Sequence, residues 1–269
     1  MDIDKLSGFF CPDDTFRVEV VNILCGDLFT NAAKNYLLKI YNEMDNEIDN
    51  NVYIIKPLSS NLNSKIHKDT LKGEMGNLYA GHDLPVWLNN PGEADNKRLM
   101  IISQDPRRND NEMKGKEIGV STPFGLHSRK WRSYKLRGLP ISCAADLINL
   151  LNNNLSVYFT DIYKLRGVGG NSVIDTPNKS VYIEILKKEI DLFKPDVILT
   201  LGKEAEEVMA DILNNSKIEP APHPNARPNI WKAYEKGIKG YSACEKKKII
   251  IQKLQGLLQS INHKIIRYK

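Results

Sequence analysis

From residue 99 onward, short apolar runs alternate with longer stretches of helical periodicity, and this alternation constrains the fold more than any other feature. Four runs predict strands, over residues 99–103, 157–160, 197–201 and 218–221. The stretches between them place apolar side chains at helical spacing. Strands that alternate with helices in this way form a parallel sheet with crossover helices. The sequence therefore predicts an α/β fold.

Several helices are predicted around these strands. One covers residues 143–151, one opens at Thr176-Pro177, one follows Gly202 and one covers 245–261. Thr176 is a good cap, and a proline in the first turn suits a helix start. The core face of that helix is predicted to contain Ile183, Leu186, Ile190 and Phe193.

Before residue 99 the patterns are less regular. Residues 28–44 predict a helix and 52–55 a short strand, whereas the turn-rich residues 58–96 predict an irregular approach to the first core strand. We expect one compact unit, with an N-terminal extension over residues 1–96 packed on a domain over 97–269.

Composition places the chain among ordinary globular proteins, since 269 residues with 41% hydrophobic and 26% charged content can bury a full core. No apolar run is as long as a bilayer-spanning helix, and the first residues lack a secretory signal, so we expect a cytoplasmic monomer without a membrane partner. The four cysteines form no Cys-x-x-Cys pair. Reduced thiols are predicted, with no metal and no cofactor.

Four residues are predicted to meet where the strands end, because ligands bind at the carboxyl ends of open parallel sheets. They are Asp105, Asp161, Gly202 and His223. Asp105 and His223 each precede a proline, which holds the preceding residue extended. We interpret these two as catalytic. Alternatively, His223 braces the last strand and Asp161 caps a loop.

A basic stretch over residues 129–137 mixes cations with flat rings, which suits phosphates and unstacked bases. A solvated loop with two anchoring aromatics is the alternative. The stretch contains Arg129, Lys130, Trp131, Arg132, Tyr134, Lys135 and Arg137.

Three separated blocks between residues 99 and 231 resemble the uracil-DNA glycosylase superfamily. Residues 102–106, Ile-Ser-Gln-Asp-Pro, are similar to its first motif, Gly-Gln-Asp-Pro-Tyr-His. Residues 157–164 and 195–202, with Ala205, resemble its bacterial and archaeal iron–sulfur branch. His223-Pro224-Asn225 resembles its closing His-Pro-Ser motif.

This resemblance implies a fold and an activity. The fold is a four-stranded parallel sheet flanked by helices in three α/β/α layers, here with a helical N-terminal extension. The activity is hydrolysis of the N-glycosidic bond of uracil or another damaged base, flipped out of single- or double-stranded DNA.

The resemblance also implies residue roles. Asp105 would supply an anion near the sugar and orient water, and His223 would donate to the base oxygen. Gln104, Phe124 and Asp161 would bind the base, with Phe124 as the stacking ring. Arg227 or Trp231 would act as a wedge in the minor groove. The remaining DNA contacts would come from Arg107, Arg108, Arg129, Lys130, Arg132 and Asn225.

The sequence departs from the family pattern at several positions. Ser103 replaces a glycine, and Arg107 and Arg108 replace a tyrosine and a histidine. Asp161 stands where the family reads the base edge with an asparagine, and an ionised carboxylate accepts hydrogen bonds but cannot donate them. Leu165 replaces a cysteine of the iron–sulfur branch, so no cluster is predicted. These departures leave two alternatives open: a non-catalytic nucleic-acid-binding member of the fold, and a hydrolase of small nucleosides or nucleotides.

Overall fold

A computed structural model of the chain describes residues 11–44, 53–54, 57–71, 80–93, 95–104, 106, 117–167, 176–213, 217–234 and 242–266. The helices are α1 (Asp14–Asp27), α2 (Lys34–Met44), α3 (Pro57–Ser60), α5 (Arg129–Arg132), α6 (Leu139–Leu150), α7 (Lys179–Phe193), α8 (Lys203–Ile212), α9 (Pro228–Tyr234) and α10 (Ala243–Ile266). Short 3-10 turns are η2 (Asn31–Ala33), η3 (Lys68–Leu71), η4 (Pro123–Gly125) and η5 (Thr176–Asn178). The strands are β1 (Tyr53–Ile54), β2 (Ala80–Asp83), β3 (Val86–Leu88), β4 (Lys97–Ser103), β5 (Ile118–Ser121), β6 (Leu155–Asp161), β7 (Leu165–Gly167), β8 (Val197–Leu201) and β9 (Ile218–Ala221).

The main sheet has five strands in the order β3-β6-β4-β8-β9. The strands β6, β4, β8 and β9 are parallel, which confirms the four predicted strands, and β3 adds an antiparallel edge beside β6. Every side chain of β6 and β8 is buried. Strands covered on both faces need continuous apolar runs, which explains why the sequence reveals them.

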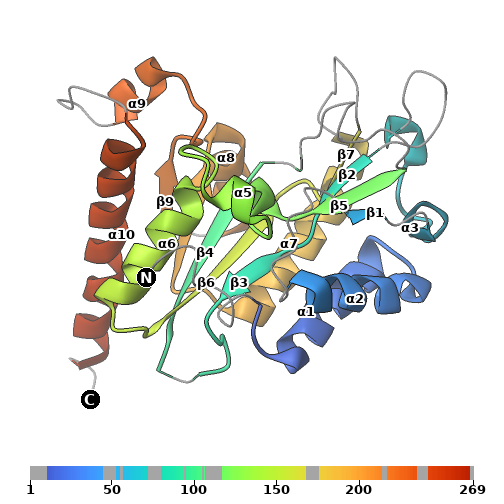
Figure 1. Ribbon diagram of the computed structural model, residues 1–269, viewed down its shortest axis with the longest axis horizontal. Helices are drawn as coiled ribbons and strands as arrows, with labels where there is room; N and C mark the ends of the chain where they lie inside the picture. Colours follow the sequence, from blue (N-terminus) through green and yellow to red (C-terminus); the bar gives the residue numbers. More distant parts are fainter. Residues whose placement is uncertain are drawn as a thin grey trace.

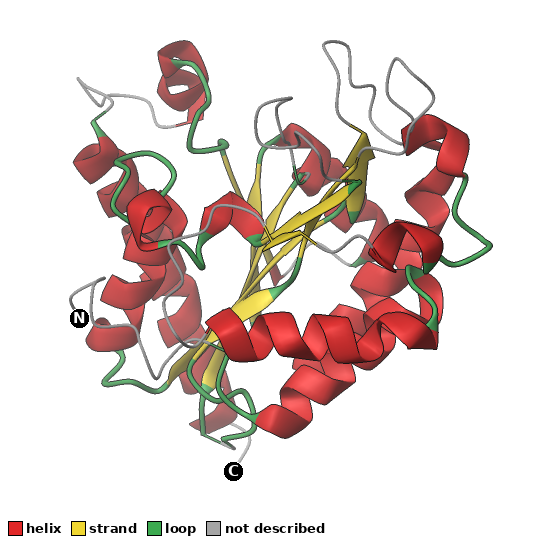
Figure 2. Ribbon diagram, turned by 45° about the vertical axis from the view of Figure 1, so that its right-hand side comes forward, coloured by secondary structure: helices red, strands yellow, loops and turns green. Residues whose placement is uncertain are grey.

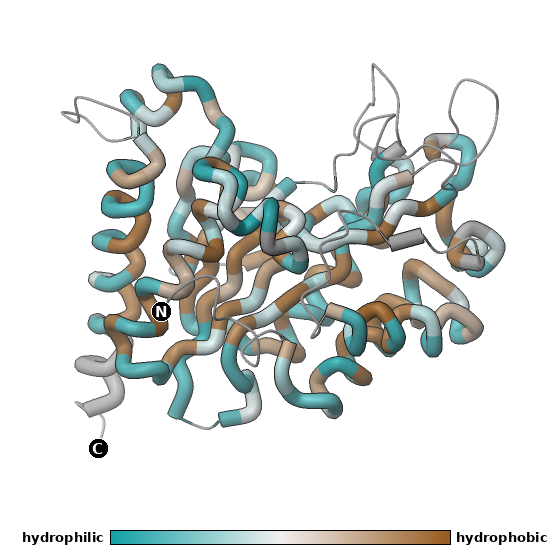
Figure 3. The backbone as a smooth tube through the Cα atoms, viewed as in Figure 1, coloured by the Kyte–Doolittle hydropathy of each residue, from teal (hydrophilic) through white to brown (hydrophobic). Residues whose placement is uncertain are grey.

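Helices cover both faces of this sheet, giving the three α/β/α layers (Figures 1 and 2). α6 packs against α10 on one face, and α7 and α8 cover the other, as right-handed crossovers require. α1 packs on α7 as an outer element. Figure 3 shows the hydrophobic residues concentrated in the central strands and on the inward sides of the helices. None of the described helices is both long and apolar enough to span a bilayer.

A second sheet, in the order β1-β5-β2-β7, was not predicted, although β1 confirms the short strand predicted over residues 52–55. It includes β2, which lies in the passage expected to be irregular, as does β3. The sequence of β2, Ala-Gly-His-Asp, offers no apolar alternation although all four residues are buried. Nδ1 of His82 donates to the backbone oxygen of Lys164 at 2.6 Å, and this bond ties β2 to the turn that follows β6.

The N-terminal helix prediction over residues 28–44 was partly wrong. Leu28 is instead the C-cap of α1, and α2 begins only at Lys34. α1 itself was missed, although its cap is clear: the carboxylate of Asp13 accepts from the backbone nitrogens of Thr15 at 2.9 Å and Phe16 at 3.2 Å. Phe16 packs edge-on to Trp87, with ring centroids 4.8 Å apart.

The helix predicted to open at Thr176-Pro177 begins instead with η5, and α7 starts at Lys179. Leu186 and Phe193 are buried as predicted, whereas Ile183 and Ile190 are only partly buried. The rest of the buried face consists of Tyr182, Ile185 and Glu189. A buried glutamate in this face implies a buried cationic partner.

Candidate active site

The ends of β4 and β6 form the floor of the candidate site. Ser103 and Asp161 are paired across the two strands, and the Ser103 hydroxyl donates to the Asp161 carboxylate. The pairing continues past the strands, because the backbone nitrogen of Tyr163 donates to the backbone oxygen of Gln104 at 3.0 Å. Gln104, the residue before Asp105, is therefore fixed at the carboxyl edge of the sheet.

Gly202 and His223 meet at the ends of β8 and β9. The backbone nitrogen of Gly202 donates to the oxygen of Ala221 at 2.8 Å. Its φ of 98° lies in a region that favours glycine. A Cβ atom at this position would lie 3.7 Å from the Cβ of His223, so the imidazole begins directly beside this turn.

The loop after β9 fixes one tautomer of His223 in its neutral form. Nδ1 of His223 accepts from the backbone nitrogen of Asn225 at 3.2 Å, so the proton of the neutral ring is carried by Nε2. Burial lowers the pKa of His223, and the charge of Lys246 lowers it further. Nζ of Lys246 in turn donates to the backbone oxygen of Pro224 at 3.0 Å. His223 is therefore held as a neutral hydrogen-bond donor.

Phe124 lies against His223, with ring centroids 5.6 Å apart and an angle of 32° between the rings. Its backbone has φ 57° and ψ 10°, which is uncommon for a bulky residue. The turn around it is closed by Thr122, whose backbone oxygen accepts from Gly125 at 2.8 Å and whose hydroxyl accepts from the nitrogen of His127 at 3.1 Å. The surrounding structure therefore imposes this conformation.

Two carboxyl groups lie together under the site. Asp161 and Asp83, from β6 and β2, are 2% and 4% exposed. Burial raises the pKa of Asp161 well above its usual range, and the Asp83 carboxylate raises it further, against a smaller opposing effect of the Ser103 hydroxyl. Asp161 therefore favours the protonated form, in which it donates as well as accepts.

A buried ion pair supports this floor from below. Nζ of Lys164 lies 2.7 Å from the carboxylate of Glu189 on α7, and both side chains are fully buried. The same ammonium donates to the Thr160 hydroxyl at 2.6 Å, which in turn donates to Glu189 at 3.1 Å. This network pins the turn after Asp161 to α7.

Three predicted site residues, Asp105, Arg107 and Arg108, lie outside the described residues, and so does the side chain of Arg129. The structure brings Gln104, Phe124, Asp161 and His223 to the carboxyl edge. Lys130, Asn225 and Arg227 are exposed near this edge.

Two of the predicted DNA contacts were wrong. Trp231 cannot act as a wedge because its side chain is fully buried, with Nζ of Lys246 5.0 Å from the ring centre. Arg132 is only 5% exposed, and its Nη1 donates to the backbone oxygens of Leu126 at 3.0 Å and His127 at 3.1 Å. It holds α5 against the Phe124 turn.

Two other residues near this edge were not predicted from the sequence. Asp83 lies in β2, the unpredicted strand. Ile230 on α9 is 48% exposed, close in the chain to His223. The sequence carries no signal for Asp83, because β2 lacks apolar alternation, and only their exposure in the folded chain separates Ile230 from Trp231 as an outward-facing residue.

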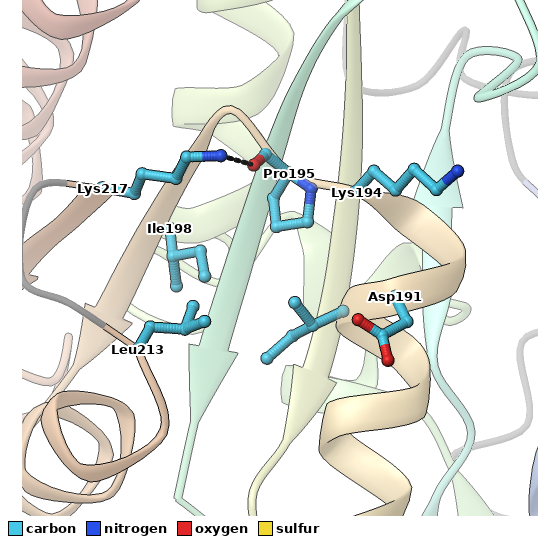
Figure 4. A pocket seen from close by; sticks show the side chains of 7 residues that line it. Asp191, Lys194, Pro195, Ile198, Leu213 and Lys217 are labelled. Carbon is cyan, nitrogen blue, oxygen red and sulfur yellow. Dashed lines mark hydrogen bonds between the residues drawn. The ribbon is translucent and has the colours of Figure 1, made fainter.

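A separate cavity of about 650 Å³ lies at the opposite end of β8 (Figure 4). Its lining residues come from the end of α7, the turn into β8, β8 itself, the residue after α8 and the residue before β9. They are Ile190, Asp191, Lys194, Pro195, Ile198, Leu213 and Lys217. It is thus distinct from the edge that carries His223.

Side chains that could ligate a metal are dispersed. Among the described residues, no group of three or more His, Cys, Asp or Glu side chains gathers as a metal site. None of the four cysteines, all of which are described, forms a disulfide; three are buried and Cys244 is exposed.

The carboxyl edge of the main sheet thus combines a neutral imidazole, an aromatic ring on a left-handed backbone and a buried carboxyl pair, and this edge is where open α/β sheets place their ligand sites. The model of the uracil DNA glycosylase superfamily matches residues 91–255, more than half of the chain. The protein belongs to this superfamily. No curated protein matches the chain.

Proposed function

We propose that this protein is a DNA glycosylase that hydrolyses the N-glycosidic bond of uracil or another damaged base flipped out of DNA. The main support is Phe124, whose backbone is held in the left-handed region and whose ring lies against His223. Such a conformation costs about 1–3 kcal/mol and recurs at functional sites. A flipped base loses its stacking neighbours, and a flat apolar ring beside a hydrogen-bond donor would replace them.

The proposed chemistry follows the charges that develop as the bond breaks. The base leaves with the bonding electron pair, so negative charge builds on its carbonyl oxygen and positive charge on the sugar. Nε2 of His223 donates to that oxygen. Asp105 stabilises the sugar and orients water, whose oxygen bonds to C1′. One water proton passes through the Asp105 carboxylate to solvent, and the base anion takes a proton from solvent.

Asp161 reads the edge of the base in this proposal. As an ionised carboxylate it would repel a base carbonyl, but burial and Asp83 favour the protonated acid. A carboxylic acid donates with its hydroxyl and accepts with its carbonyl oxygen, as an asparagine amide does. Because the Asp161 side chain is only 2% exposed and one of its oxygens accepts from Ser103, it meets the base from beneath through its other oxygen, and the partly buried Gln104 reads the rest of the base edge.

The DNA surface in this proposal surrounds the edge. Exposed Asn225 and Arg227 lie in the loop after β9, and Ile230 replaces Trp231 as the apolar wedge between base steps. Lys130 contacts a phosphate, as do Arg107 and Arg108.

The experiment incubates the protein with single- and double-stranded oligonucleotides that carry uracil, hypoxanthine or xanthine, followed by alkali. Wild type should cleave at one or more lesions. His223→Ala should lower the rate about 10²–10³-fold, as loss of a donor to a developing oxyanion does. Tyr36→Ala, at an exposed position of α2, is the control and should cleave like wild type.

Other outcomes favour the alternatives. Salt-sensitive DNA binding without cleavage of any lesion would indicate a non-catalytic binder. Release of base from free nucleosides but not from DNA would indicate a small-molecule hydrolase.

A further inference from the structure

An exposed aromatic ring stands out between α5 and α6. Tyr134 is 60% exposed, more than Tyr36, Leu150 or Ile230, the other exposed large hydrophobic side chains of the described residues. A ring left in water at this level contributes little to folding. The exposed face of the Tyr134 ring is therefore open to a ligand.

Arg137 organises a stack with this ring. Its guanidinium carbon lies 3.6 Å from the centre of the Trp131 ring and 5.8 Å from that of Tyr134. The two rings are 6.2 Å apart at 69°. No hydrogen bond or ion pair joins the Arg137 guanidinium to another described residue, so its donors are available to a ligand.

The stack is held rigidly by the backbone. A Cβ at Gly138 would lie 1.9 Å from the backbone oxygen of Arg132, so only glycine allows this turn. The nitrogen of Gly138 donates to the oxygen of Tyr134 at 2.7 Å. Gly125 lets Trp131 approach, because a Cβ there would lie 3.1 Å from the indole. A preorganised ring loses little entropy when it binds.

Two exposed lysines flank the aromatic residues. We call this surface the Tyr134 platform, and it consists of Trp131, Tyr134, Arg137, Lys130 and Lys135. Residues 129–138 contain no acidic residue, and Lys130 and Lys135 are exposed. α5 follows the turn that carries Phe124 and lies at the carboxyl end of the main sheet (Figure 1).

We propose that the Tyr134 platform binds an unpaired base of single-stranded DNA, on the strand that carries the flipped nucleotide. This inference rests on the proposed function and adds a strand preference to it. Every base has a flat face that stacks on an exposed ring, and the lysines hold the flanking phosphates. In a duplex the bases already stack on one another, so the ring has no free face to bind.

The test measures binding of a fluorescent, lesion-free DNA oligonucleotide, single-stranded or in a duplex. Tyr134→Ala should weaken single-strand binding roughly 5- to 100-fold, the loss expected for one base–aromatic stack, and leave duplex binding unchanged. Tyr134→Phe should bind like wild type. Tyr36→Ala, an equally simple loss of an exposed tyrosine, should also bind like wild type. The melting temperature of each variant confirms that it is folded.

Salt dependence tests the lysines separately. Replacing Lys130 and Lys135 by glutamine should make the slope of log affinity against log salt shallower by about 0.7 for each lost phosphate contact. An unchanged slope would overturn their assignment.

Three results would overturn the proposal: Tyr134→Ala binding single strands like wild type, equal losses for single strand and duplex, or tighter binding of the ribo-oligonucleotide of the same sequence. Because no lesion is needed, the platform can be confirmed even if no base is ever released. Conversely, base release by wild type with unaltered binding by Tyr134→Ala would reject the platform alone.

Discussion

Replacing Asp161 by asparagine should change how stability depends on pH. The carboxyl group is 2% exposed and lies beside Asp83 and Ser103. Burial, and then the Asp83 charge, raise its pKa well above the usual range. In the unfolded chain an aspartate has a pKa of about 3.9.

The size and sign of the effect follow from these two pKa values. Between them the folded protein keeps a proton on Asp161 that the unfolded chain has lost, so the free energy of unfolding falls as pH rises. The slope is about 1.4 kcal/mol per pH unit, from about pH 4 up to the pKa in the folded state. An amide binds no proton in this range, so Asp161→Asn removes this contribution. The variant should gain stability relative to wild type as pH increases.

The assay is urea unfolding of both proteins at several values between about pH 5 and about pH 8. Asp211→Asn, at an exposed position on α8, serves as the control and should follow the wild-type curve. Parallel pH dependences for wild type and Asp161→Asn would refute a raised pKa at Asp161.

Three further substitutions test the surrounding structure. Lys164→Met should lower the free energy of unfolding by about 3 kcal/mol in urea, since Glu189 loses its buried partner, and adding Glu189→Leu should restore most of it; a double variant as unstable as the single one would contradict this. Lys246→Met should raise the pKa of His223 in an NMR titration, because the ammonium charge lowers it, and an unshifted titration would rule out that coupling. Gly202→Ala should cost about 1–3 kcal/mol in urea unfolding, because its φ of 98° disfavours a side chain; equal stability would show that the backbone tolerates the change.

The predictable part of the fold is the part buried on both faces. β4, β6 and β8 each contain a run of three or four consecutive apolar residues, and this pattern identifies them, whereas β9 is only partly buried and gives a weaker pattern. β2 and β5 were not predicted because glycine, and in β2 also histidine and aspartate, interrupts their apolar residues. Their burial depends on β1, β7 and the turn after β6, which no local window contains.

In the candidate site, too, local sequence patterns predict some features, and others depend on contacts between distant segments. The positions of Asp161 and His223 were predictable because the first ends a predicted strand and the second follows one closely, whereas Phe124 was proposed as the stacking ring from its place after Thr122-Pro123. Asp161 favours a proton because of Asp83, from an unpredicted strand. Trp231 looked like a wedge, but Lys246 from the distant α10 packs over it. Such contacts arise from tertiary packing rather than local pattern.

The most direct test of base excision is to run the reaction in water labelled with heavy oxygen and to analyse both products by mass spectrometry. The label should appear on C1′ of the abasic sugar, the intact base should be released unlabelled, and Asp105→Asn and His223→Ala should each slow the reaction sharply. Absence of base release by wild type from every lesion, or release that both variants leave unchanged, would contradict the account.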